Sequence, residues 1–282
     1  MVHPAFDIRK NDLANSPADC QLLIEISAQA FNYILFSRSP DQLFLLRQYR
    51  IYTSSDKTYR DVLEEIISGD EVLQKYADKA IVVYNFPEAN IVPSELFNNT
   101  VKSAATKLVY GNTDHHFIFD EEIGDQGMRN IYFVSKDLHS LCKEKFKGSK
   151  FWHLYTMILK SADALRHAGE TSARVIFYND KFIVTVYKDG ALQLIQTFAY
   201  QTPEDAAYYL LLICKQFGIN QYEFVLNISG LIDAQSPLYT ELLKYFAHVN
   251  HEGVPATYGT NGLLDEYPSH YFSPLLKLSL CV

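Results

Sequence analysis

Two histidines near the end of the chain have the residue type and spacing of a metal site. His248 and His251 form an H-x-x-H pattern with Glu252 beside them, at the end of a predicted helix. A metal ion needs three or four ligands at suitable spacing, and the sequence indicates no further one. Histidines at the end of a helix also interact favourably with the helix dipole. We therefore interpret the pair as structural.

A second group combines histidine with carboxylates. It contains Asp114, His115, His116, Asp120, Glu121 and Glu122. In a strand, His116, Asp120 and Glu122 share one face, which could hold a cation. The favoured interpretation is a solvated acidic strand edge, which protects a sheet from aggregation. The chain also contains no G-x-S-x-G, no catalytic cysteine context and no P-loop, so the sequence predicts no catalytic residue and no metal ligand.

Composition restricts the class of protein. A chain of 282 residues can bury one substantial core or two smaller ones. Hydrophobic residues make up 48% and charged residues 21%, which is ordinary for a globular protein. The net charge of −8 and the absence of a basic stripe argue against a nucleic-acid partner, because binding the phosphate backbone requires clustered lysine and arginine.

The sequence favours the cytoplasm. Its beginning has no apolar stretch that could serve as a signal peptide. The longest apolar runs, such as Ala206–Cys214, are far shorter than the ~20 residues of a membrane span. Cys20, Cys142, Cys214 and Cys281 form no C-x-x-C, and three of them lie in apolar patterns, so we expect buried thiols.

The elements that carry these residues are repeated along the chain. Three closely spaced β-type segments occupy 20–51, and three of matching length and spacing occupy 171–200. Each trio precedes an amphipathic helix that begins T-x-x-D, with Thr58 and Asp61 in one and Thr202 and Asp205 in the other, in the manner of a capping box. A further strand follows each helix, at 80–84 and 222–228.

Each half ends with a similar octet. HLYTMILK spans 153–160 and HYFSPLLK spans 270–277, so His153 and His270 head equivalent helices and are expected to share one structural role. The repetition predicts two β-β-β-α-β-α halves with mixed sheets, at 1–168 and 169–282. Residues 86–128 lack a counterpart and are expected to form an inserted subdomain. It would contain a helix from Pro93 to about Leu108 and a polar strand pair around 115–123.

Two such halves, the first with an insertion, resemble the duplicated ribonuclease-H-like fold of actin-like ATPases, which sugar kinases, Hsp70 chaperones and bacterial actins share. The segments KFWHLYTMILKSADAL and PSHYFSPLLKLSLC are similar to an uncharacterised bacterial family of about this length, to which an actin-like ATPase fold has been assigned. The resemblance spans essentially the whole chain and rests on pattern. It implies an α/β fold and no particular activity.

The resemblance also implies where a nucleotide would bind. Active members carry D-x-G at the first hairpin of each half and a Gly-Gly pair in the adenosine motif, where glycine lets backbone N–H groups approach phosphates. Here the hairpins contain no glycine and the adenosine motif has only one. If nucleotide binding is retained, with ATP and magnesium as the cofactor, the binding residues are Glu25, Ser27, Asn179, Asp180, Ser229 and Gly230.

These degraded motifs favour a pseudo-ATPase with no cofactor. The leading hypothesis is a non-catalytic actin-like protein that acts as a cytoplasmic interaction or scaffolding module for a protein partner. The alternative is a divergent nucleotide-binding ATPase or phosphotransferase that uses the cleft between the halves. A third hypothesis is a small-molecule binder that uses this cleft without ATP.

Overall fold

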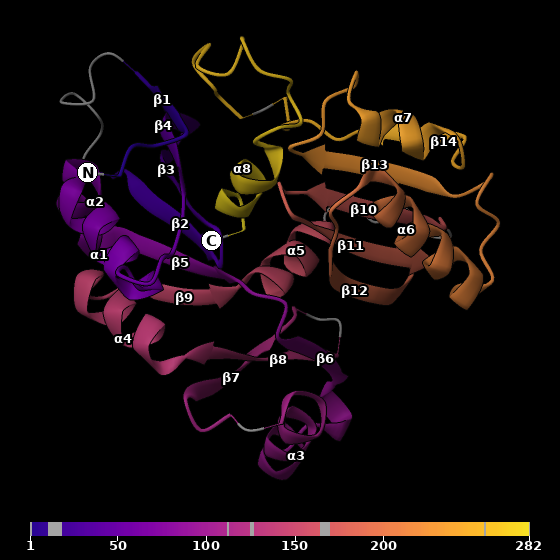
Figure 1. The fold of residues 1–282 in the computed structure, drawn as a ribbon, viewed down its shortest axis with the longest axis horizontal. Helices are drawn as coiled ribbons and strands as arrows, with labels where there is room; N and C mark the ends of the chain where they lie inside the picture. The colour runs from indigo at the N-terminus through magenta and orange to yellow at the C-terminus, as the bar shows by residue number, and fades with distance from the viewer. Residues whose placement is uncertain are drawn as a thin grey trace. The chain divides into compact units, whose positions relative to one another are not determined.

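The structure, a computed structural model, describes residues 2–10, 19–111, 113–124, 127–163, 170–256 and 258–281. The chain divides into two compact units (Figure 1). The first comprises Met1–Ala162, Thr257–Leu263 and Leu278–Val282, and the second comprises Asp163–Ala256 and Leu264–Lys277. The main boundary therefore lies at 162/163, a few residues before the expected 168/169. Two late segments return to the first unit, where the Gly259 carbonyl accepts a hydrogen bond of 2.8 Å from Leu43 N.

The first unit is built on a six-stranded mixed sheet of order β1-β4-β3-β2-β5-β9. Strands β2, β3 and β4 form an antiparallel meander, and β5 and β9 add in parallel. The central strands are buried almost throughout, which explains their continuous apolar sequence. The strands are β1 (Phe6–Arg9), β2 (Gln21–Ser27), β3 (Ala30–Arg38), β4 (Asp41–Arg50), β5 (Ala80–Asn85) and β9 (Lys150–His153).

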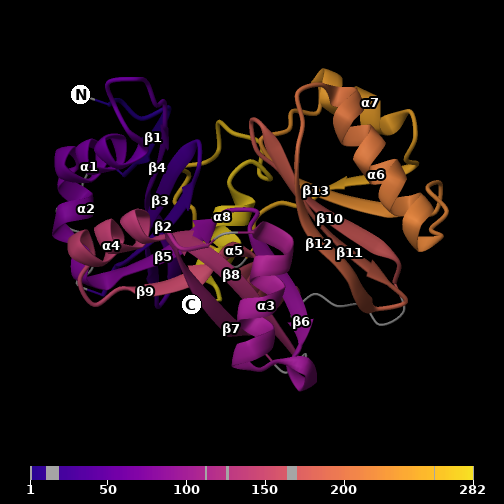
Figure 2. The same ribbon diagram turned by 60° about the horizontal axis from the view of Figure 1, so that its bottom comes forward.

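Helices cover both sides of this sheet. In Figures 1 and 2, α1 (Tyr59–Gly69), α2 (Glu71–Lys75) and α4 (Lys136–Lys145) lie along one side, and α5 (Leu154–Asp163) lies on the other. The short turn η2 (Ala77–Lys79) connects α2 to β5. The predicted capping box of α1 is confirmed, because Thr58 Oγ1 accepts from Asp61 N and the Asp61 carboxylate accepts from Thr58 N. This fixes the residue at which α1 begins, and the hydrogen bond from Tyr59 OH to Ser27 O joins that start to the β2–β3 hairpin.

The second unit repeats the arrangement. Its sheet has the order β12-β11-β10-β13-β14, which matches β4-β3-β2-β5-β9 strand for strand. The predicted duplication is therefore confirmed. Thr202 and Asp205 form the second capping box, and Gly218 ends α6 in the left-handed conformation. The elements are β10 (Ser172–Phe177), β11 (Lys181–Lys188), β12 (Ala191–Ala199), α6 (Pro203–Phe217), β13 (Val225–Gly230), α7 (Pro237–Leu243) and β14 (His248–His251).

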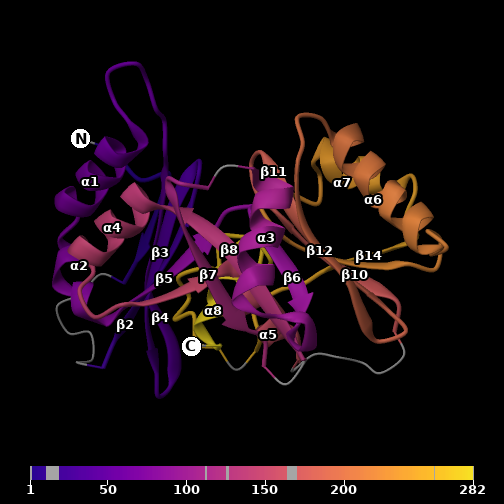
Figure 3. The same cartoon turned by 90° about the horizontal axis from the view of Figure 1, so that it is seen from below.

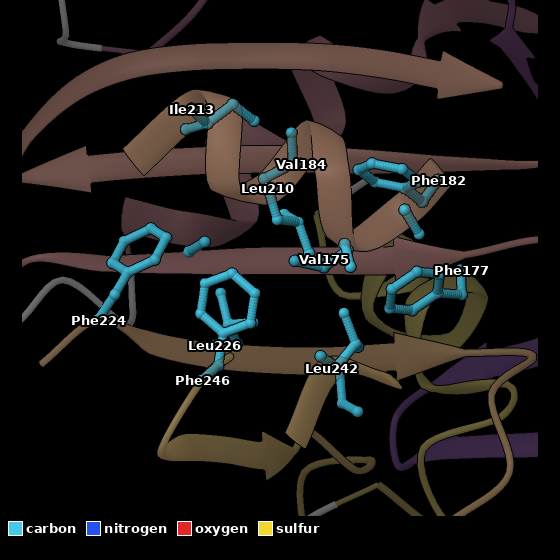
Figure 4. Close-up of a cluster of buried hydrophobic side chains, with 14 of the residues drawn as sticks. Val175, Phe177, Phe182, Val184, Leu210, Ile213, Phe224, Leu226, Leu242 and Phe246 are labelled. Atoms are coloured by element: carbon cyan, nitrogen blue, oxygen red, sulfur yellow. The ribbon is translucent and has the colours of Figure 1, made fainter. Parts of the chain in front are cut away.

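The core of the second unit lies between its sheet and helices α6 and α7 (Figure 4). Aromatic and branched side chains from both layers meet there, and each is at most 3% exposed. Burial of this apolar surface is what orients α6 and α7 on the sheet. The labelled side chains are Val175, Phe177, Phe182, Val184, Leu210, Ile213, Phe224, Leu226, Leu242 and Phe246.

The insertion in the first unit is a small three-stranded antiparallel sheet of order β6-β8-β7, with α3 packed against it (Figure 3). The helix expected from Pro93 begins later, because 89–93 pair with β8 as a strand. Residues 115–123, expected to form a strand pair, contain a single strand that pairs with residues 128–135, so the subdomain extends beyond residue 128. The elements are β6 (Ala89–Pro93), η3 (Ser94–Leu96), α3 (Asn99–Tyr110), β7 (His116–Glu122) and β8 (Met128–Ser135).

The two octets begin equivalent helices, α5 and α8 (Ser273–Ser279). The thiols of Cys20, Cys142 and Cys214 are buried, as expected from their apolar surroundings, and Cys281 is half-buried. Burial raises the pKa of the Cys142 thiol to about 12, which keeps it protonated and unreactive at neutral pH. Within the described ranges, no helix is long and apolar enough to cross a membrane.

Candidate functional site

The first predicted nucleotide residue, Glu25, lies in the interior of the six-stranded sheet. It is 3% exposed, and its carboxylate accepts hydrogen bonds from two side-chain amides, Asn85 Nδ2 at 2.5 Å and Asn32 Nδ2 at 3.4 Å. Asn32 faces Glu25 across the β2–β3 pair, and Asn85 ends the neighbouring strand β5. The carboxylate is therefore held by the protein's own amides.

Ser27 stabilises the hairpin turn that follows β2. Its Oγ accepts a hydrogen bond from Ala30 N at 3.1 Å, and its carbonyl accepts one from Tyr59 OH at 2.8 Å. Because Tyr59 is the first residue of α1, this bond joins the turn to the helix. The side chain and carbonyl of Ser27 thus both have structural partners.

In the second unit, Asn179 and Asp180 form the tight turn between β10 and β11. Tyr178 N donates to Lys181 O at 2.8 Å, and Tyr200 N donates to Asp180 O at 3.0 Å. The Asn179 side chain is exposed. The turn contains no glycine, so a phosphate would meet Cβ atoms where glycine would leave its backbone N–H groups accessible.

Gly230 has a packing role at the end of β13, next to the buried Ser229. Its φ is +83°, and a Cβ at this position would lie 2.2 Å from the carbonyl oxygen of Phe177 on β10. Its N–H donates to His270 O at 2.8 Å. Only glycine allows the two strands to approach so closely. These residues, like Glu25, do not fit a cradle for ATP and magnesium.

The two octet histidines make the same contact in their own units. His153 Nε2 donates to Phe86 O at 3.0 Å, just after β5, and His270 Nε2 donates to Ile232 O at 2.6 Å, just after β13. In both units the imidazole therefore ties the start of the last helix to the loop that leaves the fourth strand of the repeat. This shared structural role agrees with the matched octets.

The H-x-x-H pattern lies on β14 and not at the end of a helix, which corrects the expected context. Side chains three apart on a strand point to opposite faces, so His248 and His251 are not placed to share an ion. The His251 ring packs against the His270 ring with centroids 4.2 Å apart, and burial together with the charge of His270 lowers its pKa. The described residues contain no group of three or more histidine, cysteine or carboxylate side chains that could hold a metal.

The acidic strand β7 is neutralised by neighbouring cations. The Asp120 carboxylate pairs with Lys102 Nζ and Arg129 Nη2, each at 2.6 Å. Glu121 points the other way and accepts from Tyr132 OH at 2.6 Å. Burial raises the pKa of Glu121, although hydrogen bonds from Thr156, Tyr132 and the backbone of His153 oppose the shift. The predicted cluster therefore stabilises the small sheet.

A pocket that the sequence did not reveal lies within the first unit. Its volume is about 530 Å³, which is within the range of ligand-binding pockets. The starts of α1 and α4, the β2–β3 turn, the loop after β5 and strands of the small sheet form its walls. Its apolar lining residues are Ala28, Leu63, Phe86, Phe133, Val134, Leu138 and Leu141, and its polar ones are Thr58, Tyr59, Arg60, Glu88, His116, Ser135 and Asp137.

The pocket brings together segments that are far apart in the sequence. Of its lining residues, only Thr58 belongs to a predicted capping box and only His116 to the predicted histidine–carboxylate group. The feature of the sequence that could have indicated a pocket is that two helices of the same half begin after strands, at Thr58 and Ser135. That signal does not reveal that the two starts face a common cavity.

Comparison with known proteins identifies the class first. The fold is similar to a Bacteroides thetaiotaomicron protein with an actin-like ATPase fold and unknown function, at 17% identity, a TM-score of 0.75 and coverage of 93% of this chain and 96% of that one. It is also similar to a chain of the PilM–PilN type IV pilus biogenesis complex, at 10% identity, a TM-score of 0.68 and coverage of 92% and 97%. The protein therefore has an actin-like ATPase fold.

The family follows from the sequence itself. A family model described as a protein of unknown function (DUF3822) matches residues 9–249, and the chain belongs to this family. The expected resemblance to an uncharacterised family with an actin-like fold is thereby confirmed. No curated protein matches the chain.

Proposed function

We propose that this protein is a non-catalytic interaction module of the cytoplasm, built on an actin-like ATPase fold, that binds a protein partner. The observation that carries the proposal is that the Glu25 carboxylate is buried and hydrogen-bonded to side chains of the protein itself. The family resemblance matches Glu25 to the fold's magnesium-organising aspartate, and its carboxylate accepts hydrogen bonds from Asn32 and Asn85. Phosphoryl transfer depends on positioned N–H groups and metal-linked carboxylates. Because the Glu25 carboxylate already bonds two side-chain amides, its environment argues against ATP turnover.

The packing of Gly230 supports the same proposal. The single glycine left in the adenosine motif is required for the approach of β13 to β10, which explains its presence without a nucleotide. Isothermal titration of the purified full chain with ATP and Mg²⁺ tests this half of the proposal. We expect no saturable heat. Micromolar binding that both Glu25→Gln and Asp180→Ala abolish would establish the divergent ATPase instead.

The interaction half rests on the pocket of the first unit and on the structural relative. The pocket has a mostly apolar floor, and pockets of this kind mark binding sites. The relative in the pilus biogenesis complex shows that a similar fold can be part of a protein–protein complex. We assign the partner to this pocket because it offers a concave apolar surface.

Site-specific photocrosslinking in the native host tests the interaction. Benzoylphenylalanine replaces Ala28, an exposed residue that lines the pocket, and in a matched control it replaces the adjacent exposed Gln29, which does not. We expect one partner, identified by mass spectrometry, to be crosslinked at position 28 at a yield well above that at position 29. Equal yields, or none at either position, would contradict a partner at this pocket.

A further inference from the structure

The polar side chains on the α1 side of the pocket already have partners within the first unit. Tyr59 OH donates to Ser27 O at 2.8 Å, and Thr58 forms the capping box of α1. Arg60 pairs with Glu64, at 2.8 Å, and approaches Glu144 at 3.8 Å. These groups are not left to orient a polar ligand, and the positive charge of Arg60 is neutralised by neighbouring carboxylates.

Two carboxylates of the pocket differ from this pattern. Within the described part of the chain, neither Glu88 nor Asp137 has an ion-pair partner. Asp137 lies in the first turn of α4, where the helix dipole favours negative charge. Glu88 lies on the loop between β5 and β6 and has no such support. The pocket therefore has a negative edge, in a chain whose net charge is −8.

Most of the buried lining beside these carboxylates is hydrocarbon, and His116 and Ser135 are its polar residues on the small-sheet side. Leu63 and Leu141 are fully buried, Val134 and Leu138 are at most 5% exposed, and Phe133 is 9% exposed. A small polar ligand requires precisely placed polar groups around it. An apolar floor beneath an anionic edge instead suits anchor side chains of a partner chain, with cationic groups beside them.

We propose that the pocket receives a basic segment of a partner protein, in which aliphatic or aromatic anchor residues enter the floor while lysine or arginine meets Glu88 and Asp137. This inference rests on the interaction function proposed above and adds the chemistry of the partner. The volume of about 530 Å³ accommodates side chains and not a folded element, so the partner contributes a short segment.

Two synthetic peptides test the inference. Both place leucine and phenylalanine at the same positions of an amphipathic sequence, and one carries lysine where the other carries glutamate. The full chain is labelled in leucine and valine methyl groups, and methyl shifts are followed during titration. We expect the lysine peptide to perturb the Val134, Leu138 and Leu141 methyls, with an affinity that falls as salt is added. The glutamate peptide should leave these methyls unchanged.

Variants separate the two elements of recognition. Ala28→Trp should fill the mouth of the pocket and abolish the methyl perturbation, whereas Gln29→Trp should preserve it. Glu88→Gln combined with Asp137→Asn should weaken the lysine peptide by about two- to fivefold per charge. The control Glu95→Gln, an exposed carboxylate outside the pocket, should leave the affinity unchanged.

The outcomes distinguish this inference from the proposed function. Equal binding of both peptides at the same methyls would overturn the basic partner and retain the pocket as a docking site. Perturbation by phenethylamine but by neither peptide would overturn the inference in favour of a small-molecule site. No perturbation by any of these probes would also overturn it, whereas a partner crosslinked at position 28 would still support the interaction function.

Discussion

Both carboxylate oxygens of Glu121 on β7 accept a hydrogen bond from the backbone N–H of His153, the last residue of β9. The two oxygens lie 3.0 and 3.1 Å from His153 N. Strand β9 is the edge of the six-stranded sheet, so this N–H has no neighbouring strand to bond. A side chain of the inserted sheet therefore satisfies the backbone of the main sheet, and the insertion is joined to the first unit at this point.

This contact predicts a pH dependence of stability. Burial raises the pKa of Glu121 above the ordinary glutamate value of 4.5, so the folded state binds more protons than the unfolded state between these two pKa values. The contribution of Glu121 to the free energy of unfolding must then fall as pH rises through that window. Glu121→Gln removes this titration. Urea unfolding across the window should show wild-type stability declining relative to the variant.

The control for this measurement is Glu122→Gln, an exposed carboxylate on the same strand. It should retain the pH profile of the wild type. A wild-type stability that rises relative to Glu121→Gln with increasing pH would show that the hydrogen bonds to Glu121 outweigh its burial.

Substitution of Gly230 should destabilise the second unit. Gly230→Ala places a Cβ 2.2 Å from Phe177 O at a φ of +83°, so overpacking and backbone strain add to give about 3 kcal/mol or more. Chemical denaturation measures the loss. Gly69→Ala, at the last residue of α1, is the control, since a Cβ there meets nothing within 4 Å and the free energy of unfolding should change by less than about 0.5 kcal/mol. Comparable losses in both variants would refute the packing role of Gly230.

Removal of the Glu25 carboxylate should lower the free energy of unfolding, because the carboxylate has a structural role. Glu25→Ala leaves the buried amides of Asn32 and Asn85 without this acceptor, at a cost of about 1–3 kcal/mol on top of the lost packing. The measurement is urea unfolding, with Glu25→Gln as the isosteric comparison that keeps one acceptor and loses less. Unchanged stability in Glu25→Ala would show that the carboxylate has no structural role.

Substitution of either octet histidine, His153 or His270, should lower the free energy of unfolding by a similar amount. His153→Ala and His270→Ala each leave one loop carbonyl, Phe86 O or Ile232 O, without its imidazole donor, so each should lower the free energy of unfolding by about 1–3 kcal/mol. His248→Ala, at an exposed position of β14, should change it by less than about 0.5 kcal/mol. A loss at only one of the two octets would contradict their equivalence.

Local chemistry was predictable where neighbours in sequence make the contact. Thr58 with Asp61, and Thr202 with Asp205, form capping boxes because each partner lies one helical turn away. The strands β9 and β14 were missed because each has four residues, too few to show a periodic pattern. His251 was consequently expected on a helix, and a strand places it differently.

The amino-acid sequence by itself determined the duplication, because alternation, helix starts and the paired octets are all local patterns that recur. It also determined the absence of glycine from both hairpins. Only the tertiary structure decided which contacts the residues at the expected nucleotide positions make. Glu25 accepts a hydrogen bond from Asn85, which lies 60 residues further along the chain, and Gly230 packs against the backbone of Phe177 on the neighbouring strand. It also decided the pocket, because burial of apolar faces brings the starts of α1 and α4 together from segments that share no sequence pattern.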